Sequence, residues 1–207
     1  MKNKATILHR KRTLSRLIAV QVFYQFEFFK GLNPPDSASA GPTQEPTPLT
    51  RGQISLNELK NNLIDNYVLN STDEEKSYRK KIDEDFLQNL LDGLALSVAT
   101  IDPEISALLK SDSKLEKLPS VIRQILRFGA FELKFTQDVP LKVVIYEYVD
   151  LTACFFPTPQ ITFVNSILEN LAKKFREEEY SKISANHRHN DFVKANNNSP
   201  TTETQSS

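Results

Sequence analysis

The basic residues at the start of the sequence are the clearest candidates for chemistry with another molecule. The whole chain is balanced, with 26 basic and 26 acidic residues. Its first 26 residues nevertheless contain no acidic side chain and carry all of the following cations: Lys2, Lys4, Arg10, Lys11, Arg12 and Arg16. Clustered guanidinium and ammonium groups bind phosphates, so this local charge points to nucleic acid or an anionic lipid surface as the partner.

A helix is expected to position this charge. Apolar residues recur at helical spacing from residue 13 to about 30, at Leu14, Leu17, Ile18, Val22 and Phe26. Arg12 and Arg16 are four residues apart and share a face near the N-terminal end, where the helix dipole repels cations. An external anion would offset that repulsion. Further along, Gln21 and Tyr24 supply an amide that can read a base edge and a ring that can stack on a base.

Other interpretations of this segment stay open. A solvated basic tail accounts for the charge about as well as RNA binding does, and a lipid-binding helix is weaker because its apolar face would be lost from the core. A signal peptide or membrane span is not expected, because Gln21, Gln25 and Glu27 interrupt the apolar run. With Cys154 as the only cysteine, and placed in an apolar stretch, a reducing, cytoplasmic location is expected.

The rest of the compact part also shows helical patterns. A short helix is predicted around Leu56–Leu63, and a strong one starts near Asp83 and breaks or kinks at Asp102–Pro103. Pro119 and Pro140 each open a further helix, and a last one runs from about 160 to 178. Gly129 inside a predicted helix indicates a close helix crossing. Six or seven helices with short connections predict an all-α fold.

Composition divides the chain into parts. Residues 1–9 are read as a flexible basic leader and residues 10–178 as the helical domain. An insertion at about 31–53 interrupts that domain, and its residues 31–50 hold five of the 11 prolines. Residues 179–207 are read as a disordered polar tail, in which the histidines of HRHN (187–190) are a weak metal candidate. No catalytic group, cofactor loop or metal site is predicted.

Four segments in order resemble the NusB family of bacterial transcription antitermination factors. They are RKRTLSRLIAVQVFYQFEF (10–28), VIRQILRFGAFEL (121–133), DVPLKVVIYEYVDL (138–151) and FVNSIL (163–168). The resemblance implies a single all-helical domain made of two small bundles. It also implies a non-enzymatic protein that needs no cofactor.

The family's function implies partners and site residues for this chain. With NusE, a small-subunit ribosomal protein, the family binds boxA RNA in ribosomal RNA leaders and promotes processive transcription by RNA polymerase. By resemblance the RNA contacts are Arg10, Lys11, Arg12, Arg16, Gln21, Tyr24 and Phe163. The NusE contacts are Tyr24, Ile122 and Arg123. Glu132 and Glu147 are expected to form structural pairs with Arg127 or Lys142 rather than to act in catalysis.

The chain also departs from the family pattern. Thr162 and Ser166 replace a basic residue and a glycine around FVN, Tyr146 replaces an asparagine, and Ile122 replaces an acid. Two alternative functions remain at this point. One is an RNA-binding module like the N-terminal domain of ribosomal RNA cytosine methyltransferases, although the sequence has no Gly-rich cofactor loop. The other is a helical DNA-binding regulator, although the basic residues cluster before and within the first helix.

Overall fold

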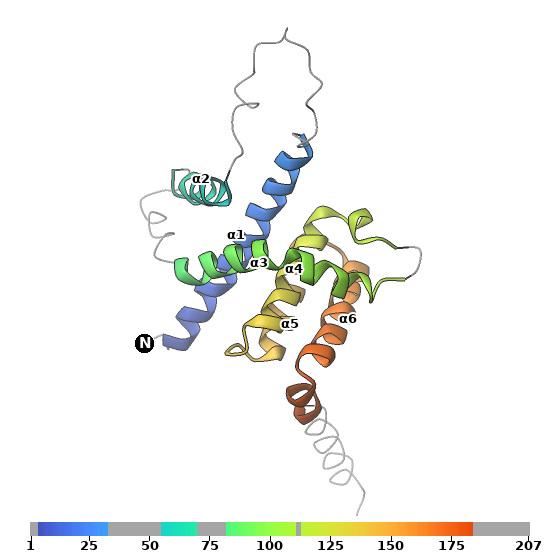
Figure 1. Cartoon of the computed structure of the whole chain (residues 1–207). Coiled ribbons are helices and arrows are strands. Elements are labelled where there is room, and N and C mark those ends of the chain that lie inside the picture. Colours follow the sequence, from blue (N-terminus) through green and yellow to red (C-terminus); the bar gives the residue numbers. More distant parts are fainter. Residues whose placement is uncertain (1–3, 33–54, 70–81, 111–112, 184–207) are drawn as a thin grey trace, which may run out of the picture.

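The computed structural model describes residues 4–32, 55–69, 82–110 and 113–183, and these residues form helices without any strand (Figure 1). The all-α prediction is therefore confirmed. Residues 33–53 of the predicted insertion and the HRHN segment lie outside the described residues. Residues 4–9, predicted as part of a flexible leader, are helical and belong to α1 (Lys4–Leu32).

Two helices pack on α1 to form the first bundle. They are α2 (Leu56–Leu69) and α3 (Glu84–Ser106). Ser55 and Glu58 cap α2 reciprocally: the Ser55 backbone N–H donates to Glu58 Oε2 at 2.8 Å and the Glu58 N–H donates to Ser55 Oγ at 3.2 Å. The predicted start of α3 is confirmed, because the Asp83 side chain accepts a hydrogen bond from the Phe86 N–H.

The helix predicted to break or kink at Asp102–Pro103 does not break there. Helix α3 runs through Pro103 and ends at Ser106, and the Ala107 N–H still donates to the Pro103 carbonyl at 3.0 Å. A proline removes one helical hydrogen bond and crowds the carbonyl four residues earlier. Both Pro103 and that residue, Ala99, are exposed, so water can satisfy the freed carbonyl. Asp102 does not cap a helix; its carboxylate pairs with Arg127.

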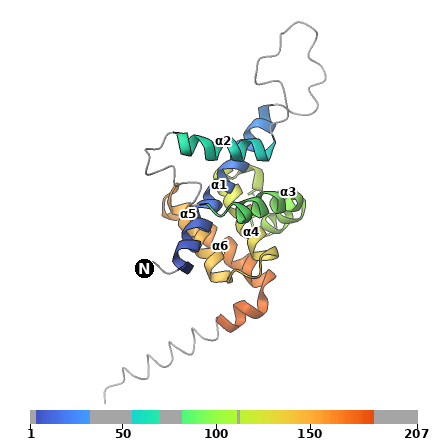
Figure 2. The same cartoon turned by 90° about the vertical axis from the view of Figure 1, so that its left-hand side faces the viewer.

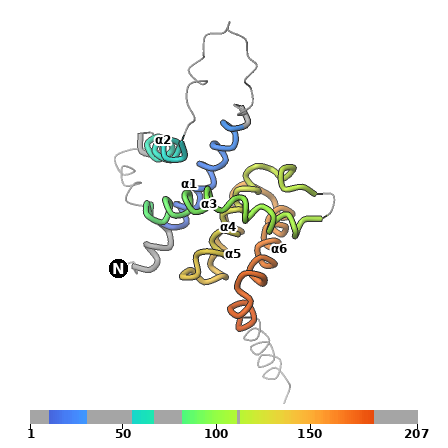
Figure 3. Tube along the Cα trace, viewed as in Figure 1, coloured from blue at the N-terminus to red at the C-terminus, as the bar shows by residue number. Residues whose placement is uncertain are grey.

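The second bundle follows after a single 3₁₀ turn (Leu115–Lys117). It comprises α4 (Ser120–Phe135), α5 (Leu141–Ala153) and α6 (Thr158–Phe175). Pro119 and Pro140 precede α4 and α5 directly, as predicted. Helix α4 also packs on α1 and α3, so it belongs to both bundles and is buried along most of its length (Figures 2 and 3).

Gly129 lies where α4 meets α5 and α6. A Cβ at this position would lie 2.7 Å from Leu168 Cδ2 and 3.3 Å from Tyr148 Cδ2. The close crossing predicted from a glycine inside a helix is therefore confirmed. Gly93 on α3 plays the same part against the Phe131 ring, which the sequence analysis did not identify.

The end of α4 is held by Arg176, just beyond α6. Its guanidinium donates hydrogen bonds of 2.6–2.8 Å to the carbonyls of Glu132, Leu133, Thr136 and Val139. The Leu133 carbonyl lies in the last turn of α4, where carbonyls lack helical donors, and this one buried side chain satisfies it together with the Val139 carbonyl of the connection to α5. Residues 177–183 are helical, and Glu179 accepts from the Leu141 N–H at 2.9 Å. The predicted tail therefore does not begin at residue 179.

Candidate nucleic-acid interface

Arg16, predicted to face RNA, lies inside the protein. Only 3 % of its side chain is exposed, and it donates two hydrogen bonds of 2.8 Å to the two carboxylate oxygens of Glu132 on α4. A third, of 3.3 Å, reaches Glu147 on α5. The Tyr148 hydroxyl donates to the same Glu132 at 2.6 Å. Arg16 is therefore excluded from an RNA surface, and Glu132 pairs with Arg16 rather than with the predicted Arg127.

The charges in this buried group support one another. Burial works against the charged form of Arg16, but the hydrogen bonds and negative charge of Glu132 outweigh it and raise the arginine pKa above its ordinary value. Burial, together with the charge of Glu132, also raises the pKa of the Tyr148 hydroxyl. Arg16 thus stays charged and Tyr148 stays protonated at neutral pH. Together they tie α1 to α4 and α5.

The sequence contained a signal for this burial. Arg16 is followed at helical spacing by Ala19, Val20 and Phe23, and all three are at most 3 % exposed. The arginine thus extends an apolar face. Its partners, Glu132 and Glu147, lie on the buried sides of α4 and α5. Only the tertiary structure shows that these glutamates contact Arg16.

The exposed part of the basic cluster is smaller than predicted. Arg12 keeps 31 % of its side chain exposed, pairs with Asp83 at 3.3 Å and stacks on the Phe86 ring, 4.8 Å from the ring centroid. Lys11 is half-buried. Arg10 is on α1, but its side chain lies outside the described residues.

Gln21 and Tyr24 do not share a face with Arg12. Nine residues of α-helix turn through about 900°, which places Gln21 on the opposite side of α1 from Arg12. Position 10 precedes Gln21 by 11 residues and therefore falls near the same face. Tyr24 is 41 % exposed, and Phe28, which the sequence analysis did not single out, is 58 % exposed one turn further on. Position 10, Gln21, Tyr24 and Phe28 therefore fall on one side of α1, where Tyr24 and Phe28 are exposed and Gln21 is half-buried.

Phe163 lies in the second turn of α6. Its side chain is partly buried and packs against the core. Phe155, in the turn between α5 and α6, is 46 % exposed and is a further ring near that end of the bundle. The sequence analysis did not identify Phe155 as a site residue.

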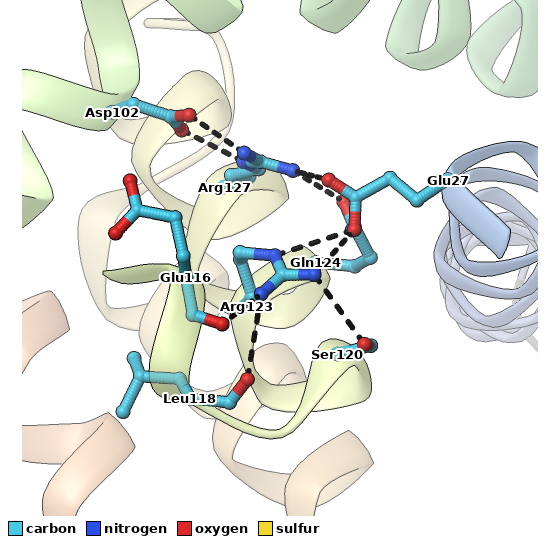
Figure 4. A network of polar contacts seen from close by, with 8 residues as sticks. All are labelled: Glu27, Asp102, Glu116, Leu118, Ser120, Arg123, Gln124 and Arg127. Atoms are coloured by element: carbon cyan, nitrogen blue, oxygen red, sulfur yellow. Dashed lines mark hydrogen bonds and ion pairs between the residues drawn. The ribbon is translucent and has the colours of Figure 1, made fainter. Parts of the chain in front are cut away.

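Glu27 organises the surface expected to contact NusE (Figure 4). Its carboxylate accepts hydrogen bonds from Arg123, at 2.7 Å and 3.3 Å, and from Arg127. Arg127 also donates to Asp102 at 2.6 Å and 2.7 Å, so three helices meet here. Burial acts to raise the pKa of Glu27, but the two arginines outweigh it and hold that pKa below its ordinary value.

This arrangement corrects the predicted NusE contacts. Ile122 is 2 % exposed and belongs to the core, so it is excluded from a contact surface. Arg123 keeps 13 % of its side chain exposed and also donates to the carbonyls of Glu116 and Leu118. Its visible role is to join α4 to α1 and the 3₁₀ turn. Tyr24 remains accessible.

Within 4–32, 55–69, 82–110 and 113–183, no group of three or more His, Cys, Asp or Glu side chains is arranged to hold a metal ion. In the same ranges, no helix has the length and apolar character needed to cross a membrane.

Known proteins resemble this chain in sequence and in fold. A family model described as "NusB family" matches residues 49–173. The transcription antitermination protein NusB of Maricaulis maris is 39 % identical over 98 residues, which are 47 % of this chain and 61 % of that protein. The protein of the same name from Caulobacter vibrioides is 41 % identical over 95 residues, or 46 % of this chain and 64 % of the relative. The chain thus spans about three fifths of the curated relatives it matches.

A solved structure shows the same architecture. The structure described as T. maritima NusB superposes with a TM-score of 0.57 at 23 % identity, covering 82 % of this chain and 96 % of that one. The fold and the site define a small all-helical protein of two bundles that share a central helix. Because the family model covers more than half of the sequence, the chain belongs to the NusB family.

Proposed function

We propose that this protein is an RNA-binding transcription antitermination factor. Together with NusE it binds a boxA-like single strand in ribosomal RNA leaders, and it promotes processive transcription by RNA polymerase in the cytoplasm. It acts by binding and carries out no catalysis. Family membership and the names of its relatives support the proposal, and we propose the exposed side of α1 as its binding surface.

The observation that carries the proposal is the exposed face of α1. Tyr24 offers an exposed ring, Gln21 lies half-buried on the same side of the helix, and the sequence has an arginine at position 10 near that side. Single-stranded RNA is read by stacking on rings and by hydrogen bonds to base edges, while Arg and Lys supply phosphate affinity. Lys11, Arg12 and Phe163 are proposed as flanking contacts. Arg16 is not, because it is buried in the protein.

NusE is proposed to bind near the C-terminal half of α1. Tyr24 is the accessible residue there, and Arg123 lies at the edge of the surface with a small exposed fraction. The Glu27 pairs fix the angle between α1 and α4 and thereby shape this surface.

The test is RNA binding by charge-reversed variants. Fluorescence anisotropy measures the affinity for a boxA-like strand and for a scrambled strand, with and without NusE. We expect Arg10→Glu/Lys11→Glu to weaken boxA binding more than tenfold and to flatten its salt dependence, because each lost phosphate contact removes about 0.7 from the slope. Tyr24→Ala is expected to weaken binding further through lost stacking, worth about 1–3 kcal/mol per base.

The matched control changes charge equally elsewhere. Lys110 and Lys114 are exposed on the connection after α3, and Lys110→Glu/Lys114→Glu has the same charge change. If the two double variants bind the boxA-like strand equally, nonspecific electrostatic attraction accounts for the binding and the α1 surface is not the site. If wild type binds the boxA-like and scrambled strands alike with NusE present, the proposal fails.

A further inference from the structure

A groove of about 550 Å³ lies where the start of α3 meets the end of α4. Phe86, Leu90 and Phe131 form its apolar wall, and Asp85, Phe135 and Asp138 stand at its rim. The groove is at the opposite end of α4 from Arg123, so it is separate from the surface proposed for NusE. Arg12, proposed above as a flanking RNA contact, is one of its lining residues.

One end of the groove already holds a cation of the protein itself. The Arg12 guanidinium pairs with Asp83 at 3.3 Å and lies 4.8 Å from the centroid of the Phe86 ring. A carboxylate beside an aromatic face is a favourable site for a guanidinium, because the ring attracts the cation and the carboxylate accepts its hydrogen bonds. Arg12 thus shows how the groove can bind a guanidinium: between an aromatic ring and a carboxylate.

Two further carboxylates and a ring among the lining residues are open to an outside molecule. Asp85 and Asp138 are exposed and form no ion pair with the residues that the structure describes. Phe135 is 50 % exposed and its ring rests on Phe131, with the centroids 5.4 Å apart. Lys134 lies 5.9 Å from the Phe135 centroid, but its ammonium group pairs with Glu104 on α3.

The balance of charge identifies the kind of ligand. Three carboxylates and one guanidinium line the groove, which leaves two negative charges beside an apolar wall. Phosphates would be repelled there, so a nucleic acid does not fit. A chain that alternates cationic and apolar side chains satisfies both features, since its arginines reach the carboxylates while its apolar groups pack on the exposed Phe135 ring and on Phe131, which is 9 % exposed.

We propose that this groove docks a basic, amphipathic peptide segment of a protein partner. An arginine of that segment lies against Phe135 between Asp85 and Asp138, and a neighbouring apolar side chain packs on Phe131. The interaction does not depend on the proposed RNA-binding function.

The test uses the full chain and a defined probe. A fluorescein-labelled peptide of alternating arginine and leucine is titrated by anisotropy, and a peptide of alternating glutamate and leucine serves as the ligand control. We expect the arginine peptide to bind, and Asp85→Asn/Asp138→Asn to weaken it on the order of tenfold by removing two carboxylate–guanidinium pairs. Phe135→Ala is expected to weaken it several-fold through loss of the cation–π contact.

A control variant with the same change of charge and an NMR measurement test whether the peptide binds at the groove. Asp150→Asn/Glu178→Gln removes two exposed carboxylates away from the groove and is expected to leave peptide affinity unchanged. Backbone amide shifts in the NMR spectrum should move at residues 83–90 and 131–138 when the arginine peptide is added. Equal losses in the two double variants, shifts elsewhere, or equal binding of both peptides would overturn the proposal.

Discussion

At the scale of single residues, the surroundings of a charged side chain decide its role. Arg12 and Arg16 share a side of α1, yet one reaches the surface and the other is closed in by α4 and α5. A buried ion pair costs desolvation, so its formation is weak evidence for high stability. Removing one partner is different, because the other charge is then left buried without compensation.

Replacing Arg16 tests this view. Arg16→Met keeps the apolar stem of the side chain but removes the guanidinium, so that of the described partners of Glu132 only the Tyr148 hydroxyl remains. We expect the free energy of unfolding, measured with urea, to fall by about 3–5 kcal/mol. Arg12→Met removes a partly exposed pair and should cost about 1 kcal/mol or less. Similar losses for the two variants would contradict the assignment of Arg16 as a core residue.

At the scale of elements, α4 organises the molecule. It contacts α1, α3, α5 and α6, and its close approach to α6 depends on Gly129 having no side chain. Intrinsic propensity alone would favour alanine at this position by about 1 kcal/mol. The structure predicts the reverse, because Leu168 is fully buried and has little room to move.

We therefore expect Gly129→Ala to lower the free energy of unfolding by about 1–3 kcal/mol, as overpacking does. A double-mutant cycle with Leu168→Ala tests whether the clash with Leu168 is the cause. In the Leu168→Ala background, Gly129→Ala should lower the free energy of unfolding much less. Ala95→Gly is the control: Ala95 is exposed on α3, so this change measures the helix propensity of alanine over glycine where no other helix packs closely. A more stable Gly129→Ala variant would show that the two helices separate at little cost.

At the scale of the whole molecule, the last described residues close the second bundle. Arg176 and Glu179 follow α6, but their hydrogen bonds end on α4, on the α4–α5 connection and at the start of α5. Buried carbonyls that lose their donors keep the full desolvation cost, on the order of 1–3 kcal/mol each. The protein is therefore expected to need its chain as far as this segment.

Two shortened chains test that expectation. A chain that ends at residue 183 keeps every described contact and should match the full chain within about 0.5 kcal/mol. A chain that ends at residue 175 should lose about 3 kcal/mol or more, as measured by urea unfolding. Arg176→Ala in the full chain should reproduce most of that loss, while the exposed Glu177→Ala should not. Equal stability of both shortened chains would remove the role assigned to Arg176.

The sequence by itself determined the helical elements. Helix starts at Asp83, Pro119 and Pro140 follow from local capping and proline geometry, and the crossing at Gly129 follows from the cost of glycine in a helix. Pro103 does not break the helix because it lies near an exposed helix end, where one missing hydrogen bond costs little.

Only the tertiary structure decided which charges remain available to a partner. Arg16 meets Glu132, which lies 116 residues away, and Arg176 reaches the carbonyl of Leu133, 43 residues before it. Sequence periodicity reports which residues share a helix face, but not what lies opposite that face. An arginine can satisfy the same chemistry with a phosphate in solution or with a carboxylate in the core, and the packing of the helices selects between them.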